Sequence, residues 1–129
     1  MLTFSSAHDN DLLNVVSALG LYEQDRDLPA TAIQRNRTFK ASEITPMGGR
    51  IILERLVSVD DASKSEVYVR ININDGILAL HKCDSGPERS CPLEHFIKLV
   101  QDVGSKEGDF AERCALDSHA RKRIEFLHQ

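Results

Sequence analysis

The sequence predicts an α/β fold within a single small domain. Two segments, 12–19 and 93–100, carry apolar residues at helical spacing. The stretch between them over residues 50–80 is rich in isoleucine, leucine and valine, and it contains the hairpin turn signal Asn-Asp-Gly at 74–76. The chain has 129 residues, which is enough to bury one modest core. The predicted order is therefore strand, helix, long polar excursion, three-stranded meander and helix.

The first two predicted elements meet at residue 8. Residues 2–7 form a short apolar run that predicts a strand. Apolar residues then recur with the spacing of one helix face, at Leu12, Val15, Val16 and Leu19. Gly20 is the predicted end of this helix. Residues 23–43 are polar and predict a long excursion with one helical turn.

The central region predicts an antiparallel meander. Residues 50–59 predict its first strand, and residues 60–65 predict a solvated loop. The next strand alternates apolar and polar residues, and its apolar face consists of Val67, Val69, Ile71 and Ile73. The hairpin turn at 74–76 leads into a return strand over 77–80.

The last predicted helix begins at Pro92 and ends at Gly104. Its apolar stripe consists of Leu93, Phe96, Ile97 and Val100. Two helices are too few to cover both faces of a sheet of three or four strands. We therefore expect the fold to be incomplete alone, with the apolar face that begins at Val67 left uncovered.

The composition argues against two classes of partner. A formal net charge of −4 and a pI near 5.7 are atypical of a general nucleic-acid binder. No apolar stretch reaches the roughly 18–20 residues that a membrane span needs. The N-terminus also lacks the basic start and long apolar core of a signal peptide. We expect neither a nucleic acid nor a membrane as partner.

The cysteines and one sequon favour an oxidising compartment. Cys83 and Cys91 flank a polar loop with a Gly-Pro turn signal at 86–87, so their thiols can meet, and we predict a disulfide between them. Cys114 is then left unpaired in this chain. The acceptor pattern Asn-Arg-Thr begins at Asn36, a candidate for N-glycosylation. The alternatives are a chance sequon and three reduced, buried thiols in a cytosolic protein.

His8 and Asp9 stand where the predicted strand meets the predicted helix. The N-terminus of a helix presents free backbone N–H groups and a partial positive charge, so it favours anions. A histidine there can donate a hydrogen bond to a phosphate, and the neighbouring carboxyl can protonate a leaving alcohol. The alternative is that Asp9 only caps the helix, by accepting from the N–H two or three residues on, and that His8 is an ordinary polar residue.

Several motifs together resemble the fungal histidine acid phosphatases, which include the phytases. The stretch Phe-Ser-Ser-Ala-His-Asp-Asn at 4–10, followed by Leu-Gly-Leu-Tyr at 19–22, resembles the family's His-Asp acid motif. Pro-Met-Gly-Gly-Arg at 46–50 resembles its Pro-x-Gly-x-Arg strand. Residues 69–75 resemble its Val-Arg-x-x-x-Asn-Asp hairpin. These motifs follow one another in the family's order and spacing.

The resemblance continues through the cysteines. Cys83 and Cys91, with the helix after them, resemble the family's small disulfide loop, and Cys114 resembles its last cysteine, which bonds to an earlier part of the chain. The resemblance implies that residues 1–116 are the C-terminal part of a histidine acid phosphatase domain. The tail over 117–129 matches nothing in the family and predicts a weakly structured segment.

The resemblance also implies roles for two residues. His8 would contact the substrate phosphate, and Asp9 would be the proton donor. The family's nucleophile is a histidine in an Arg-His-Gly-x-Arg-x-Pro motif, which this sequence does not contain. The other four histidines stand outside any such motif and are expected to be structural or surface residues: His81, His95, His119 and His128.

The implied activity is hydrolysis of phosphomonoesters, phytate among the candidates, through a phosphohistidine and with no cofactor or metal. The implied enzyme is secreted or bound to the cell wall. This chain alone would be inactive, and its partner would be the missing N-terminal part of the same protein. Two alternatives remain open: a non-catalytic phosphate- or protein-binding module derived from the family, and a generic α/β domain with a capped helix.

Overall fold

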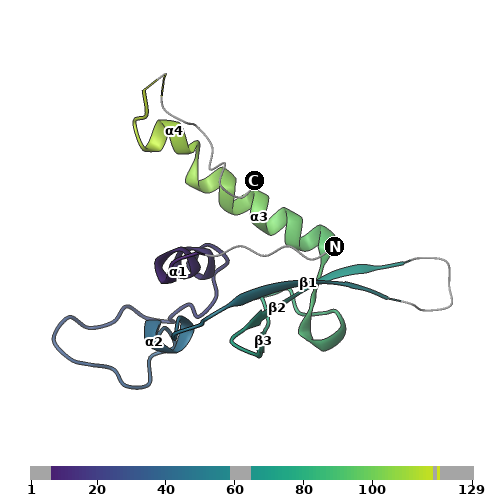
Figure 1. Ribbon diagram of the computed structural model, residues 1–129, viewed down its shortest axis with the longest axis horizontal. Helices are drawn as coiled ribbons and strands as arrows, with labels where there is room; N and C mark the ends of the chain where they lie inside the picture. The colour runs from purple at the N-terminus through teal and green to yellow at the C-terminus, as the bar shows by residue number, and fades with distance from the viewer. Residues whose placement is uncertain (1–6, 59–64, 118, 120–129) are drawn as a thin grey trace.

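A computed structural model describes residues 7–58, 65–117 and 119 (Figure 1). Its elements in chain order are α1 (Asp9–Ala18), α2 (Ala41–Ile44), β1 (Ile51–Val57), β2 (Val67–Ile73), β3 (Gly76–Leu78), the 3-10 turn η1 (Pro87–Arg89), β4 (Cys91–Pro92), α3 (Leu93–Glu107) and α4 (Phe110–Arg113). The α/β class is confirmed. All but the last residue of the predicted strand over 2–7 and most of the predicted loop over 60–65 lie outside the described residues.

The sheet is antiparallel, and β2 is its central strand. β1 pairs with one edge of β2 along its whole length, from Ile51 opposite Ile73 to Val57 opposite Val67. β3 and β4 pair with β2 as well, so they share its other edge. The return strand is shorter than predicted, because the chain turns back after β3 and Leu80 forms an isolated bridge with Cys83.

The predicted hairpin joins β2 and β3, and its turn consists of two residues because Gly76 already belongs to β3. Asn74 and Asp75 have φ angles of 50° and 68°, in the left-handed region. Ile73 pairs directly with Gly76 across the turn. Two successive left-handed residues are typical of a type I′ turn, whose twist matches that of the flanking strands. Asparagine and aspartate tolerate this conformation better than most residues, which is why the signal could be recognised in the sequence.

The apolar face of β2 is covered within this chain, contrary to the prediction. Val69, Ile71 and Ile73 are buried. Ile71 and Ile73 belong to one core cluster whose other members come from α1, the segment after it, α2, the segment after β3 and the disulfide: Val16, Leu21, Ile44, Leu80, Cys83 and Cys91. Helix α1 and the polar excursion fold back over the central strand, which the local sequence pattern could not reveal.

The exposed apolar side chains lie elsewhere. Large hydrophobic residues are exposed on the edge strand β1, on the outer side of α1 and along α3: Leu53, Val57, Val15, Ile97 and Val100. Figure 1 shows why α3 contributes to this surface, because most of its length extends away from the sheet. Within the described residues, α3 has no fully buried side chain. An incomplete fold is therefore still indicated by its apolar surface, but the uncovered side chains lie on β1, α1 and α3 and not on the face of β2. No helix in the described part of the chain is long and apolar enough to cross a membrane.

Helix α3 ends four residues later than predicted. Gly104 lies inside the helix, and the end falls at Gly108, which has a φ of 76°. A glycine in a helix interior costs about 1 kcal/mol relative to alanine, which is too little to end an otherwise favourable helix. The short helix α4 was not predicted. The Asp109 carboxylate accepts a hydrogen bond from the Glu112 backbone N–H at 3.0 Å, and this Asp-x-x-Glu spacing is a helix-start signal.

The predicted disulfide between Cys83 and Cys91 is present, with the two Cα atoms 4.8 Å apart. Inside its loop, the buried Ser90 hydroxyl donates to the Pro87 carbonyl at 2.6 Å. Gly86 lies so close to the Tyr68 ring that a Cβ atom would be 2.4 Å from it. Cys114 is free and exposed. The loop is thus closed by covalent, hydrogen-bonded and packing contacts.

An ion-pair cluster joins this loop to the outer face of the meander. Arg70 on β2 donates to the Glu54 carboxylate on β1 at 2.7 Å, and it also pairs with Glu88 in η1. The hydrogen bond from Arg70 lowers the pKa of Glu54 below its ordinary value. The carboxylate therefore stays ionised to lower pH than an isolated glutamate, and the pairing persists into mild acid.

Removing the disulfide should destabilise the fold. A chain with both Cys83→Ser and Cys91→Ser should lose about 2–3 kcal/mol in the free energy of unfolding, because the cross-link restricts the unfolded chain. Urea unfolding under oxidising conditions measures this loss. Cys114→Ser is the matched control and should leave stability unchanged, since that thiol is free and exposed. Three reactive thiols in denatured, oxidised wild-type protein would contradict the assignment.

Candidate active site

His8 is the N-cap of α1, the residue directly before the helix. Its backbone is extended, with φ −83° and ψ 163°, and the helix starts at Asp9. The Asp11 carboxylate accepts a hydrogen bond from the His8 backbone N–H at 3.0 Å. The His8 carbonyl in turn accepts from the Asp11 backbone N–H at 3.1 Å. A carboxylate three residues after the first flanking residue is a recognised helix-start signal, so Asp11 could have been found in the sequence and was missed.

Asp9 makes a different contact from the one expected of a simple cap. Its carboxylate accepts a hydrogen bond from the N–H of the adjacent residue, Asn10, at 2.9 Å. It does not reach the N–H groups two or three residues on, and the capping contact to the start of α1 comes from Asp11. Both His8 and Asp9 are exposed. The acid at position 9 therefore remains accessible at the helix N-terminus.

His8 and Asp9 line a hollow of about 1010 Å³. On the helix side the wall is completed by Ala7 and Leu12, and the opposite wall is the segment over residues 45–51, which runs from the end of α2 to the first residue of β1. The sequence had indicated both the His-Asp pair and the Pro-Met-Gly-Gly-Arg stretch as separate motifs. The fold brings both motifs together around one cavity. Their proximity depends on tertiary packing, which neither motif shows by itself.

Asn74 holds the opposite wall in place. Its side-chain amide N–H groups donate to the Ile44 carbonyl at 2.8 Å and to the Glu43 carbonyl at 3.1 Å. Its side-chain oxygen accepts from the Arg50 backbone N–H at 3.0 Å. The guanidinium of Arg50 pairs with Asp75 on the same hairpin turn. The hairpin therefore fixes both ends of the segment over 45–50.

The chemistry of this hollow suits a phosphate ester. An imidazole and the N-terminus of a ten-residue helix favour an anion, and an accessible carboxyl lies beside them. Among the described residues, His8 is the one histidine in the lining. In the part of the chain that the structure describes, no group of three or more His, Cys, Asp or Glu side chains is arranged to hold a metal ion.

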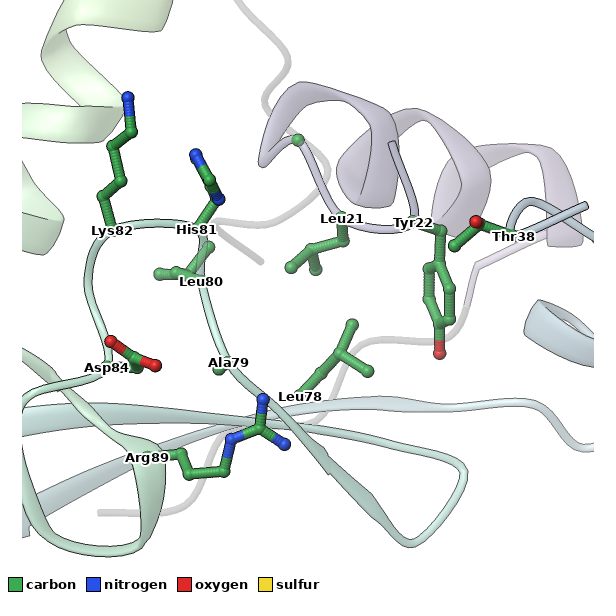
Figure 2. Close-up of a pocket in the computed structure, with 11 residues that line it drawn as sticks. Leu21, Tyr22, Thr38, Leu78, Ala79, Leu80, His81, Lys82, Asp84 and Arg89 are labelled. Carbon is green, nitrogen blue, oxygen red and sulfur yellow. The ribbon is translucent and has the colours of Figure 1, made fainter. Parts of the chain in front are cut away.

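A second hollow, of about 480 Å³, lies next to Leu21 and Tyr22 (Figure 2). His81 and Lys82 contribute to its lining but point away from Arg89, as Figure 2 shows. Its cationic side chains therefore do not converge on one point. We therefore do not consider this hollow a candidate anion site.

The other histidines that the structure describes lie outside the candidate active site. His95 lines a third hollow, between the start of β2 and the start of α3. His119 is exposed, and its backbone N–H donates to the Asp117 carboxylate at 2.8 Å. His128 lies outside the described residues.

Comparison with known proteins identifies the family. The family model of the histidine phosphatase superfamily (branch 2) matches residues 1–74. The chain belongs to this family. The matched region contains both walls of the hollow and ends at Asn74, the residue that joins the wall over 45–51 to the hairpin. The resemblance drawn from the sequence motifs is thereby confirmed.

The most informative relatives are fungal phosphatases. The chain is 40% identical to an acid phosphatase of Komagataella pastoris over 124 residues, which are 96% of this chain and 26% of the relative. It is 38% identical to a phytase of Candida albicans over 95% of this chain and 25% of the relative. The crystal structure of the phytase from D. castellii superimposes with a TM-score of 0.76 at 30% identity, covering 92% of this chain and 24% of that one. The chain thus spans about a quarter of the length of these relatives and has part of their fold.

Proposed function

We propose that this chain supplies the proton-donor half of the active site of a phosphomonoester hydrolase of the acid phosphatase and phytase type. His8 binds an oxygen of the substrate phosphate, and Asp9 protonates the leaving alcohol. The observation that carries the proposal is the position of this pair, exposed at the N-terminus of α1 and opening into a hollow of about 1010 Å³. The family match over residues 1–74 supports the same assignment.

The proposed reaction has two steps. A histidine supplied by the rest of the enzyme attacks phosphorus, the bond to the ester oxygen breaks, and the proton of Asp9 passes to that oxygen as the alcohol leaves. Water then hydrolyses the phosphohistidine and releases inorganic phosphate. A phosphate dianion beside the Asp9 carboxyl favours its protonated form, so the enzyme should work best in acid.

The proposed partner is the part of the enzyme that corresponds to the remaining three quarters of the relatives. The exposed apolar residues of β1, α1 and α3 support this, because surfaces of this kind mark places where another part of a protein packs. Secretion is proposed as well. A disulfide between Cys83 and Cys91 and an exposed Asn36 in a glycosylation pattern are compatible with a secretory route.

A non-catalytic phosphate-binding module is the second candidate. It is favoured by one observation: within the described residues, the lining of the hollow has a single histidine and so no separate nucleophile. Such a module would bind phosphate through His8 without turning over any ester, even when joined to the missing part of the fold.

A chimera tests the proposal. The matching quarter of the K. pastoris acid phosphatase would be replaced by residues 1–129 of this chain. We expect the chimera to hydrolyse phosphomonoesters at acid pH, because the two share 40% identity over this region. The same chimera with His8→Ala should have a strongly raised KM. A folded chimera without turnover would favour the binding module.

A further inference from the structure

The wall opposite His8 and Asp9 includes an exposed methionine. Met47 lies at the tip of the segment that forms this wall, and its side chain is fully exposed. A flexible, polarisable thioether at the rim of a cavity can adapt to the shape of an apolar ligand.

A tight turn presents Met47 at that tip. The Gly49 backbone N–H donates to the Pro46 carbonyl at 2.7 Å, and Gly48 has a φ of +75°. A positive φ at the third residue is typical of a type II turn, in which Met47 is the second residue. At Gly49 a Cβ atom would be 2.9 Å from the Pro46 carbonyl oxygen, so a side chain there would push this turn apart.

The turn is also anchored on both sides. Asn74 bonds to the Ile44 carbonyl before the turn and to the Arg50 N–H after it. The backbone that carries Met47 is therefore held in one conformation. The position of Met47 relative to the His8 and Asp9 wall therefore follows from the fold and is not that of a free loop.

The two polar side chains of this wall, those of Thr45 and Arg50, already have partners within the fold. The Arg50 guanidinium pairs with Asp75, and the Thr45 hydroxyl donates to the Ala41 carbonyl at 3.0 Å. The remaining side chains of the wall are apolar: Pro46, Met47 and Ile51. The lining of the cavity thus combines polar side chains at the N-terminus of α1 with largely apolar side chains from the segment over 45–51.

We propose that Met47 is a specificity-determining residue that packs against the alcohol part of the substrate and favours phosphomonoesters with an apolar or aromatic alcohol. This inference rests on the proposed phosphate site at His8. With phosphate bound at the helix N-terminus, the ester oxygen and its substituent extend across the cavity to the opposite wall. A polar or polyanionic alcohol would find few free partners there, whereas an aromatic ring can contact the Met47 sulfur.

The chain offers a direct probe, because it has only two methionines, Met1 and Met47. The full chain would be labelled with ¹³C at the methionine methyl groups and titrated with phenyl phosphate, glycerol phosphate or inorganic phosphate, while NMR follows the methyl signals and the His8 ring. We expect phenyl phosphate to shift the Met47 methyl through the ring current of the phenyl group. Glycerol phosphate and inorganic phosphate should shift the His8 ring and leave that methyl in place.

Variants sharpen the test. Met47→Ser should weaken phenyl phosphate binding about two- to tenfold and leave inorganic phosphate binding unchanged. Ile97→Ser, which removes an exposed apolar side chain on α3 outside the hollow, should change neither. His8→Ala should abolish the response of the Met47 methyl to phenyl phosphate, whereas a persisting response would indicate nonspecific contact and overturn the inference.

The two proposals fail in different ways. If all three ligands shift the His8 ring but phenyl phosphate leaves the Met47 methyl unmoved, the role of Met47 is wrong and the phosphate site stands. If no ligand affects the His8 ring, the phosphate site itself is wrong, and the inference drawn from it is overturned as well.

Discussion

Replacing Asp9 with asparagine in the chimera should reduce the turnover of alkyl phosphates by about 10²–10⁴-fold. An alkoxide is a strong base, so its departure from phosphorus depends on a proton from Asp9. A nitrophenolate is a much weaker base and leaves with less help, so turnover of an aryl phosphate should fall far less. Steady-state kinetics on one alkyl and one aryl phosphate measure the difference. KM should change little for either substrate, because His8 and the helix N-terminus remain.

Asp11→Asn is the matched control for this experiment. Asp11 is two residues away on the same helix turn, and it accepts a hydrogen bond from the His8 backbone at 3.0 Å. Loss of the Asp11 carboxylate should weaken the start of α1 and lower the stability of the fold. It should not change the ratio of turnover on alkyl and aryl phosphates. Equal losses on both substrates for Asp9→Asn would indicate that this carboxylate supports the helix and does not donate the proton.

The elements that could be predicted are those whose signal is local. The turn at Asn74 and Asp75 was recognised because its left-handed backbone favours those residues. Helix α1 was recognised from the spacing of its apolar residues, and Gly20, with a φ of 64°, follows its end. The disulfide was recognised because a short polar loop with a turn signal separates Cys83 from Cys91.

The predictions that failed depended on distant parts of the chain. The face of β2 was expected to be bare, but Val16 and Ile44 approach it from α1 and α2. The helix end expected at Gly104 is overridden by the neighbouring turns of α3. The wall that carries Met47 was visible only as a motif, because its attachment to the hairpin depends on long-range hydrogen bonds from Asn74.

The isolated chain should show no hydrolysis of phosphoesters above background. Asp9 can only assist the leaving group, and another group must attack phosphorus. Among the described residues, the lining of the hollow offers no histidine besides His8, which the proposal uses for binding. Catalytic groups that act as a unit lose nearly all of their effect when one is absent. The assay is the hydrolysis of an activated aryl phosphate at acid pH by purified residues 1–129.

Adding the part of a relative that lies outside the matched region should produce turnover that we do not expect from this chain alone. The segment of the K. pastoris acid phosphatase outside the matched region would be expressed separately and mixed with residues 1–129 under oxidising conditions. The exposed apolar side chains of β1 and α3 give the two pieces a surface on which to associate, so turnover should rise with the concentration of either piece. Robust turnover by residues 1–129 alone that survives His8→Ala would refute the proposal that the active site is divided between this chain and the rest of the enzyme. Turnover by the chain alone that His8→Ala abolishes would make His8 the nucleophile, because a histidine that only binds phosphate cannot replace the attacking group.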